Sequence, residues 1–425
     1  MSIQKESSKN RGNSFIKNSF ILTFGTVVAQ IIPLVFYPIL SRFFSPSDFG
    51  VFAAVNSITS IIVVIASGKY ESVILITKTK RGASNLIWLI LIISFLSLSL
   101  FEVLFYFTSV PISHFFEIPS LSSWIYICPP TAFLIIIYQS YNEWCVRNRY
   151  FGSLSVNKVI NAGSATVLKT LFGWTNIFSG GLIAGDFLGR TISASACVVN
   201  ALKRDKELFS SPSFRQMRWL GKRYIDCPRF ILPAQLLNAL GGELPVLLMA
   251  AYFNTTQIGY YAMAITILAL PALVISQAVR DVFRKHADEI YRHTGNCFSI
   301  YKKTIFVMTL ISLVGFSLFY LIAPTLFSFV LGKEWVTAGE YARIMCPIVA
   351  ISFVSETVSS MFIVGEKMKR LLWWQSLYFL LTLISLLIGI FIFKDITITL
   401  YCFMIGRSIA HIGSLLMTSR IANGK

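Results

Sequence analysis

Runs of about twenty apolar residues recur along the whole chain and set the strongest limit on its fold. A helix needs about 20 apolar residues to cross a hydrocarbon core about 30 Å thick, so each run is a candidate membrane span. The chain has 425 residues, of which 55% are hydrophobic and only 13% charged, as in polytopic membrane proteins. The sequence therefore predicts an all-α integral membrane protein with twelve transmembrane helices. The predicted spans are 19–41, 49–77, 85–110, 121–145, 153–174, 178–202, 229–252, 257–280, 303–325, 338–363, 370–393 and 396–419.

The lysines and arginines alternate between the two sides of these spans. A net charge of +18 would suggest nucleic-acid binding in a soluble protein, but here the positive residues lie in short loops between apolar runs. Most of the 37 basic residues fall on one side, and the other side holds only Arg42, Lys333 and Lys394. Because positively charged loops stay in the cytoplasm, we expect both termini there and no nucleic-acid partner.

An internal repeat divides the spans into six and six. The longest polar break separates an N-terminal bundle, 1–202, from a C-terminal bundle, 229–425, and 203–228 is the predicted basic cytoplasmic linker. Since six is an even number, both copies enter the membrane in the same direction, which gives two parallel six-helix pseudo-repeats. The matching landmarks are Ser47–Ala53 with Gln257–Ala262, and Cys128-Pro129 with Cys346-Pro347.

Charged residues inside the spans are the candidates for a functional site. Each costs about 2.5–3.5 kcal/mol at a helix centre, so the deep ones should face a cavity or a partner. Arg190 and Arg407 stand out because each lies in a Gly-Arg-hydroxyl-Ile sequence, and we expect them to line a cleft between the two halves. The predicted substrate-binding cations are Arg190, Arg407, Lys169, Lys69 and Arg343, and the predicted ion-coupling acids are Asp186, Glu243 and Glu356.

Helical spacing places some of these charges on polar stripes. One stripe contains Asp186, Arg190, Ser193, Cys197 and Asn200, and the other contains Arg407, His411, Ser414 and Thr418. Both stripes could line a wet cleft. Alternatively, Asp186 and Arg190 neutralise each other while the small residues pack helices together.

The remaining candidates also leave two interpretations open. Lys169 either faces the cleft or extends its ammonium group to the membrane surface. Lys69 follows Gly68, which marks either a break inside a span or a plain helix end. Glu243 lies in Gly241–Pro245, where an interrupted helix is expected, and broken helices of this kind often mark transport sites. Glu243 and Glu356 are either protonatable coupling groups or acids hydrogen-bonded between helices.

No motif indicates an enzyme, a cofactor or a metal. The seven cysteines form no CxxC pair, and neither HExxH nor GxSxG occurs. Gly163–Thr170 resembles a phosphate-binding loop, but Leu168 replaces the required glycine and no strand precedes it. We therefore expect a protein without enzymatic activity, cofactor or bound metal.

Several segments resemble the polysaccharide-exporter branch of the multidrug/oligosaccharidyl-lipid/polysaccharide (MOP) exporter superfamily, and within it the bacterial O-antigen flippases. The resemblance covers nearly the whole chain and rests on Leu40–Gly50, Asn254–Ala264, Leu270-Pro271, Val282-Phe283, Gly332–Trp335 and Ala338-Gly339. It implies twelve helices in two bundles, a central cationic cavity and a location in the bacterial inner membrane. It also implies alternating access that moves an undecaprenyl-pyrophosphate-linked glycan from the cytoplasmic to the periplasmic leaflet.

This function agrees with the charges noted above, because lysine and the arginine fork both bind phosphate oxygens. The lipid bilayer and other polysaccharide-assembly membrane proteins are the further candidate partners. One alternative is an ion-coupled drug or metabolite antiporter, which intramembrane positive charges disfavour. Another is a membrane O-antigen polymerase or ligase, which would need a large periplasmic loop, and a structural scaffold would not account for Arg190 and Arg407.

Overall fold

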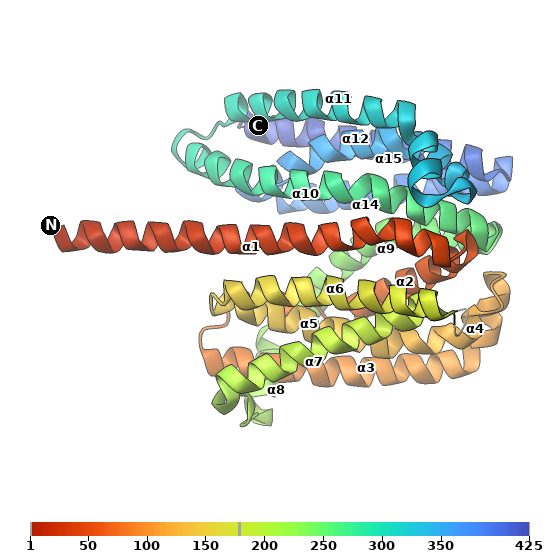
Figure 1. Ribbon diagram of the computed structural model, residues 1–425. Helices are drawn as coiled ribbons and strands as arrows, with labels where there is room; N and C mark the ends of the chain where they lie inside the picture. The colour runs from red at the N-terminus through yellow and green to blue at the C-terminus, as the bar shows by residue number, and fades with distance from the viewer. Residues whose placement is uncertain (1, 177–179, 425) are drawn as a thin grey trace. The chain divides into compact units, whose positions relative to one another are not determined.

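The computed structural model describes residues 2–176 and 180–424, and within them the chain is almost entirely helical, without strands (Figure 1). The helices of the N-terminal half are α1 (Ser2–Phe43), α2 (Pro46–Ala66), α3 (Lys80–Phe115), α4 (Leu121–Trp124), α5 (Cys128–Arg147), α6 (Phe151–Thr175), α7 (Gly181–Phe209) and α8 (Phe214–Arg223). Those of the C-terminal half are α9 (Leu232–Tyr252), α10 (Thr255–Thr294), α11 (Phe298–Leu331), α12 (Val336–Val358), α13 (Met361–Val364), α14 (Met368–Leu387) and α15 (Ile396–Ala422). Short 3-10 or π turns extend or join them: η1 (Tyr70–Val73), η2 (Ile125–Ile127), η3 (Cys227–Ile231), η4 (Lys333–Trp335) and η5 (Ile388–Phe393).

Eleven helical segments of the described chain are long and apolar enough to cross a membrane. They correspond to eleven of the twelve predicted spans. The remaining span, 153–174, corresponds to α6, which is long enough at 25 residues but more polar. Helix α6 packs against α1 and α7, and the Lys158 ammonium donates to the Thr26 hydroxyl of α1 at 2.8 Å. Such contacts supply partners for some of its polar groups away from water. The prediction of an all-α, multi-pass membrane protein is confirmed, with a helix count close to the predicted twelve.

Two predicted helix boundaries need comment. The second span was predicted to continue to residue 77, but α2 ends at Ala66 because Gly68 and Lys69 adopt left-handed backbone angles, with φ of 58° and 57°. The expected interruption at Gly241–Pro245 is wrong, since α9 is continuous from Leu232 to Tyr252 and carries Pro245 inside it. Membrane helices tolerate internal glycine and proline because neighbouring groups satisfy the freed backbone atoms.

The chain divides into two compact units that combine distant segments of sequence. The first contains Met1–Phe43, Thr59–Val110 and Ser122–Pro233, and the second contains Phe44–Ile58, Pro111–Leu121 and Ala234–Lys425. Most of the polar linker predicted at 203–228 is helical and packs within the first unit. There the Ser84 hydroxyl donates to the Leu208 carbonyl at 2.6 Å, and the Ser213 amide donates to Asn85 at 2.7 Å. The two six-helix bundles as delimited from the sequence stay a prediction.

Helices α2 and α10 cross at two glycines within the second unit. A Cβ atom added at Gly50 would lie 1.9 Å from the Thr255 carbonyl oxygen, and one added at Gly259 would lie 1.7 Å from the Pro46 carbonyl oxygen. The hydroxyls of Ser47 and Thr255 are hydrogen-bonded at 2.7 Å beside this crossing. Only glycine allows the two backbones to approach so closely.

Trp335 completes this crossing. Its ring lies edge-on to Phe49, with centroids 5.2 Å apart, and edge-on to Tyr260, with centroids 6.1 Å apart. Phe49, Tyr260 and Trp335 come from the three longest segments on which the family resemblance rests. Those segments therefore pack against one another at this crossing.

Candidate functional site

In the first unit, one carboxylate binds two of the predicted cations. Lys169 on α6 places its ammonium nitrogen 2.7 Å from Asp186 Oδ1, and Arg190 donates through Nε to Asp186 Oδ2 one helical turn away on α7. The Asp186 side chain is 8% exposed and that of Arg190 is 25% exposed. The group therefore carries one net positive charge, and the Arg190 side chain is partly exposed.

Two glycines of α7 let this group form. A Cβ atom at Gly185 would lie 2.6 Å from the Lys169 backbone nitrogen, and one at Gly189 would lie 2.3 Å from the Ala165 Cα atom. The Ser164 hydroxyl, on α6, also donates to the Gly189 carbonyl at 2.9 Å. The close approach of α6 and α7 brings the Lys169 ammonium within reach of a carboxylate on the neighbouring helix.

In the second unit, Arg407 on α15 lines a cavity of about 240 Å³ between α10, α12, α14 and α15. Its guanidinium carbon lies 4.7 Å from the centre of the Tyr378 ring and 5.0 Å from that of Phe403. Its Nε atom is buried and has no hydrogen-bond partner in the described part of the chain. Arg407 is thus held by two aromatic faces, which attract a cation and leave its N–H groups available.

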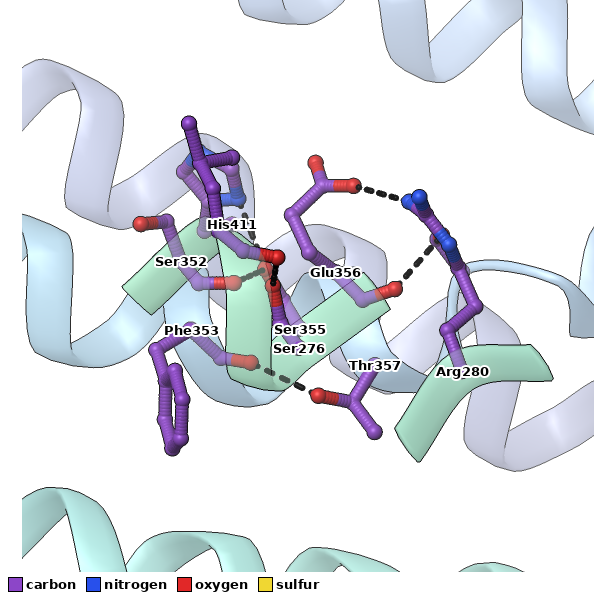
Figure 2. Close-up of polar contacts among 10 residues, drawn as sticks. Ser276, Arg280, Ser352, Phe353, Ser355, Glu356, Thr357 and His411 are labelled. Atoms are coloured by element: carbon purple, nitrogen blue, oxygen red, sulfur yellow. Dashed lines mark hydrogen bonds and ion pairs between the residues drawn. The ribbon is translucent and has the colours of Figure 1, made fainter. Parts of the chain in front are cut away.

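Glu356 lies beside Arg407 in the same cavity and binds Arg280 of α10. Figure 2 shows the Glu356 carboxylate turned toward Arg280, and the two groups lie 3.3 Å apart. Both side chains are about one-third exposed, at 35% and 32%. This ion pair is accessible and can exchange partners at lower cost than a fully buried one.

His411, one turn after Arg407, is buried and bonded to Ser355, with 2.7 Å between Nδ1 and the hydroxyl oxygen (Figure 2). The His411 ring also lies edge-on to Trp374 and Tyr378. The α15 stripe therefore faces the cavity only at its Arg407 and His411 end. Farther along, Thr418 is buried and bonded to Tyr301 at 2.9 Å, as expected for helix packing.

Three predicted site residues lie elsewhere. Lys69 binds Glu71 at 3.1 Å in the turn after α2. Arg343 on α12 donates to the Tyr320 carbonyl of α11 at 3.2 Å and does not line the Arg407 cavity. Glu243 on α9 accepts a hydrogen bond of 2.8 Å from Ser57 of α2. Lys69 and Glu71 thus have the plain helix-end arrangement, and Glu243 has the arrangement of an acid bonded between helices.

Sequence reasoning missed Arg280, Tyr378 and Phe403. Arg280 ends a predicted span and was counted among the cytoplasmic topology charges, although it binds a deep acid. Tyr378 and Phe403 lie in apolar runs with no distinguishing pattern, so no sequence signal marks their contact with Arg407. Among residues 2–176 and 180–424, no group of three or more His, Cys, Asp or Glu side chains is arranged to hold a metal ion.

The fold defines a class, the polytopic helical membrane proteins, and solved transporter structures share it. The lipid II flippase MurJ, in an inward closed conformation, matches with a TM-score of 0.74 at 13% identity, over 95% of this chain and 87% of that one. An inward-facing multidrug resistance MATE family transporter matches with a TM-score of 0.70 at 14% identity, over 93% of this chain and 98% of that one. A MOP superfamily transporter from Pyrococcus furiosus matches with a TM-score of 0.55 at 15% identity, over 96% and 95% of the two chains.

The sequence itself identifies the family. The family model described as polysaccharide biosynthesis protein matches residues 39–340, and the chain belongs to that family. No curated protein sequence matches the chain.

Proposed function

We propose that the protein is a flippase for a lipid-linked oligosaccharide. It would move an undecaprenyl-pyrophosphate-linked repeat unit, such as that of an O-antigen, from the cytoplasmic to the periplasmic leaflet of a bacterial inner membrane by alternating access. Membership of a polysaccharide biosynthesis family supports a glycan substrate, and the fold shared with a lipid II flippase supports a membrane-embedded headgroup path.

The observation that carries the proposal is the buried Nε–H of Arg407, which has no hydrogen-bond partner in the described residues. A buried N–H without a partner costs about 1–3 kcal/mol, so a bound acceptor would recover that energy. The aromatic contacts hold the guanidinium in place without satisfying its donors. A pyrophosphate offers several oxygen acceptors and negative charge, which suits such a group better than a neutral or cationic ligand.

The first unit supports the same substrate in a different way. Lys169 and Arg190 share the single carboxylate of Asp186, so their group keeps an excess positive charge. We propose that the partly exposed side chain of Arg190 binds the anionic headgroup and that Asp186 holds it in position.

The test uses a strain that lacks this gene and carries variant copies of it. We expect Arg407→Ala to reduce export of the glycan by about tenfold or more, because an anion-binding charge is worth at least about 1.4 kcal/mol. Arg407→Lys should retain part of the activity. The matched control is Arg420→Ala, which removes the same charge from an exposed position of the same helix.

The measurements are the amount of exported glycan, the lipid-linked single repeat units that accumulate on the cytoplasmic side, and the protein level in the membrane. Wild-type export by Arg407→Ala at a normal protein level would overturn the assignment of this cavity. Accumulation of single-repeat glycan at the cell surface would instead indicate a polymerase.

One feature favours the alternative of an ion-coupled drug or metabolite antiporter. Glu356 lies in the cavity and binds Arg280 loosely enough to take up a cation or proton instead. A cationic drug would need Glu356 and be repelled by Arg407, so the two functions differ in sign. If Arg407→Ala increased drug resistance while glycan export stayed normal, the antiporter would be the better assignment.

A further inference from the structure

A second, more polar cavity adjoins the Arg407 cavity. It has a volume of about 460 Å³ and shares Glu356, Tyr378 and His411 with the first cavity as lining residues. This volume lies within the range of about 300–1,000 Å³ that is usual for small-molecule sites. Any ligand bound at Arg407 therefore has a neighbouring space of useful size.

Three polar side chains of this second cavity lack hydrogen-bond partners within the described residues. The Ser360 residue is 4% exposed, and its buried hydroxyl has no hydrogen-bond partner within the described residues. The side-chain amides of Asn238 and Gln375, which also line the cavity, form no hydrogen bond with the described chain. Together they offer donors and acceptors of both kinds, which match the hydroxyl and amide groups of sugars.

An aromatic pair on α14 lines the same cavity. The rings of Trp374 and Tyr378 have centroids 5.7 Å apart, and the Trp374 indole N–H donates to the Ala410 carbonyl at 2.9 Å, which fixes the orientation of the ring. The Trp374 ring is stacked on Phe362 and the Tyr378 ring faces Arg407, so the pair forms a fixed wall of the cavity. The Arg280–Glu356 pair adds polar atoms without adding net charge.

We propose that the cavity lined by Ser360, Gln375 and Trp374 binds the glycan part of the substrate while Arg407 binds its pyrophosphate. This assignment rests on the flippase function proposed above. It predicts that two cavities bind different parts of the substrate. The Arg407 cavity binds the anionic linkage common to all such lipids, and the second cavity binds the sugars next to it.

The test measures binding to the purified full-length protein in detergent. One probe is the lipid-linked oligosaccharide extracted from the gene-deletion strain, and the other is undecaprenyl pyrophosphate without sugar. We expect the sugar-bearing lipid to bind about tenfold more tightly, and the double variant Ser360→Ala with Gln375→Leu to abolish most of that difference by removing about two hydrogen-bonding groups. Arg407→Ala should weaken both probes.

The control is Ser376→Ala, since Ser376 follows Gln375 on α14 and its hydroxyl donates to the Leu372 carbonyl of its own turn. Ser360→Ala should not lower the thermal unfolding midpoint, because the lost hydroxyl has no protein partner. If the double variant retains the full preference for the sugar-bearing lipid, the glycan cavity is wrong and the flippase stands. If the deletion strain accumulates no lipid-linked oligosaccharide, or neither probe binds the wild-type protein, the flippase itself is wrong.

Discussion

At the residue scale, the first unit shows why the ion-pair partners of a buried carboxylate cannot be inferred from its sequence neighbours alone. The spacing of Asp186 and Arg190 predicted an ion pair along one helix, and this pair is present. Lys169 of α6 joins it as a second cation. The carboxylate of Asp186 thus binds two cations, and the group is not the self-neutralising Asp186–Arg190 pair that was one of the two alternatives.

The first prediction concerns Asp186. Asp186→Asn leaves Lys169 and Arg190 close together without a counter-ion, and removing one partner from a buried ionic group costs about 3–5 kcal/mol, less here because Arg190 is partly exposed. We expect a lower thermal unfolding midpoint for the purified protein in detergent. The double variant Asp186→Asn with Lys169→Met should recover part of that loss, since only one cation then remains.

An unchanged midpoint in Asp186→Asn would mean that the ionic group contributes nothing to folding. Loss of export without loss of stability would instead assign Asp186 to transport alone.

The sequence located the deep charges but did not assign their partners. Hydropathy alone marks Arg407 and Glu356 as costly inside a span, so they could be found without a structure. Which group lies beside each depends on the rotation of helices that are distant in sequence. Arg280, 76 residues before Glu356, could not be paired with it from the order of residues.

At the element scale, the segments that carry the family resemblance have a structural role. Ser47–Gly50, Thr255–Tyr260 and Trp335 build the crossing of α2 and α10, and none of them lines the Arg407 cavity. A fingerprint made of packing residues identifies a fold well and a substrate poorly. This explains why the sequence indicated the family more clearly than the transported molecule.

The second prediction tests this crossing. Gly259→Ala would place a methyl group 1.7 Å from the Pro46 carbonyl oxygen, and such overpacking costs about 1–3 kcal/mol or more. Gly315→Ala, in the middle of α11, would place the same methyl group in open space and should leave stability unchanged or raise it by up to about 1 kcal/mol.

Thermal unfolding of the two purified variants in the same detergent gives the comparison. Equal midpoints would show that the two helices can move apart freely, and the proposed role of the glycines would fail.

Helix ends were less predictable than helix centres. The apolar run that begins with α2 continues past Ala66, but the left-handed backbone at Gly68 and Lys69 ends the helix inside it. The Gly-Gly-Glu-Leu-Pro sequence in α9 shows the opposite error, because it contains helix breakers and stays helical. In both cases backbone geometry and tertiary packing outweighed hydropathy and propensity.

At the scale of the whole molecule, the order of segments in the sequence does not give the packing units. The division at residues 203–228 stays a prediction, and by contacts Phe44–Ile58 groups with C-terminal helices while residues up to Pro233 group with N-terminal ones. Periodic hydrophobicity reports which segments are helices, whereas the grouping of helices depends on close contacts such as Gly50 with Thr255.

The third prediction concerns orientation in the membrane. The positive-inside rule places Arg149 in the cytoplasm and Lys394 on the opposite side. Both residues lie at turns and are exposed, so a thiol at either position should react readily. In a variant with Cys402 replaced by serine, Lys394→Cys should react with a membrane-impermeant maleimide on intact spheroplasts, and Arg149→Cys should react only after permeabilisation.

The other six cysteines are buried and should give a low background. Labelling of both positions from the same side would contradict the proposed topology and the odd number of spans between them. Reversed labelling would place the termini outside the cytoplasm.

The length of α10 has a mechanical consequence. Its 40 residues extend about 60 Å, roughly twice the thickness of the hydrocarbon core, so its final turns must stand well clear of the acyl chains. A tilt of about 10° about the middle of such a rod would displace its tip by about 5 Å. A spectroscopic label near Glu289 would therefore magnify small rotations of the helix into changes large enough to record during turnover.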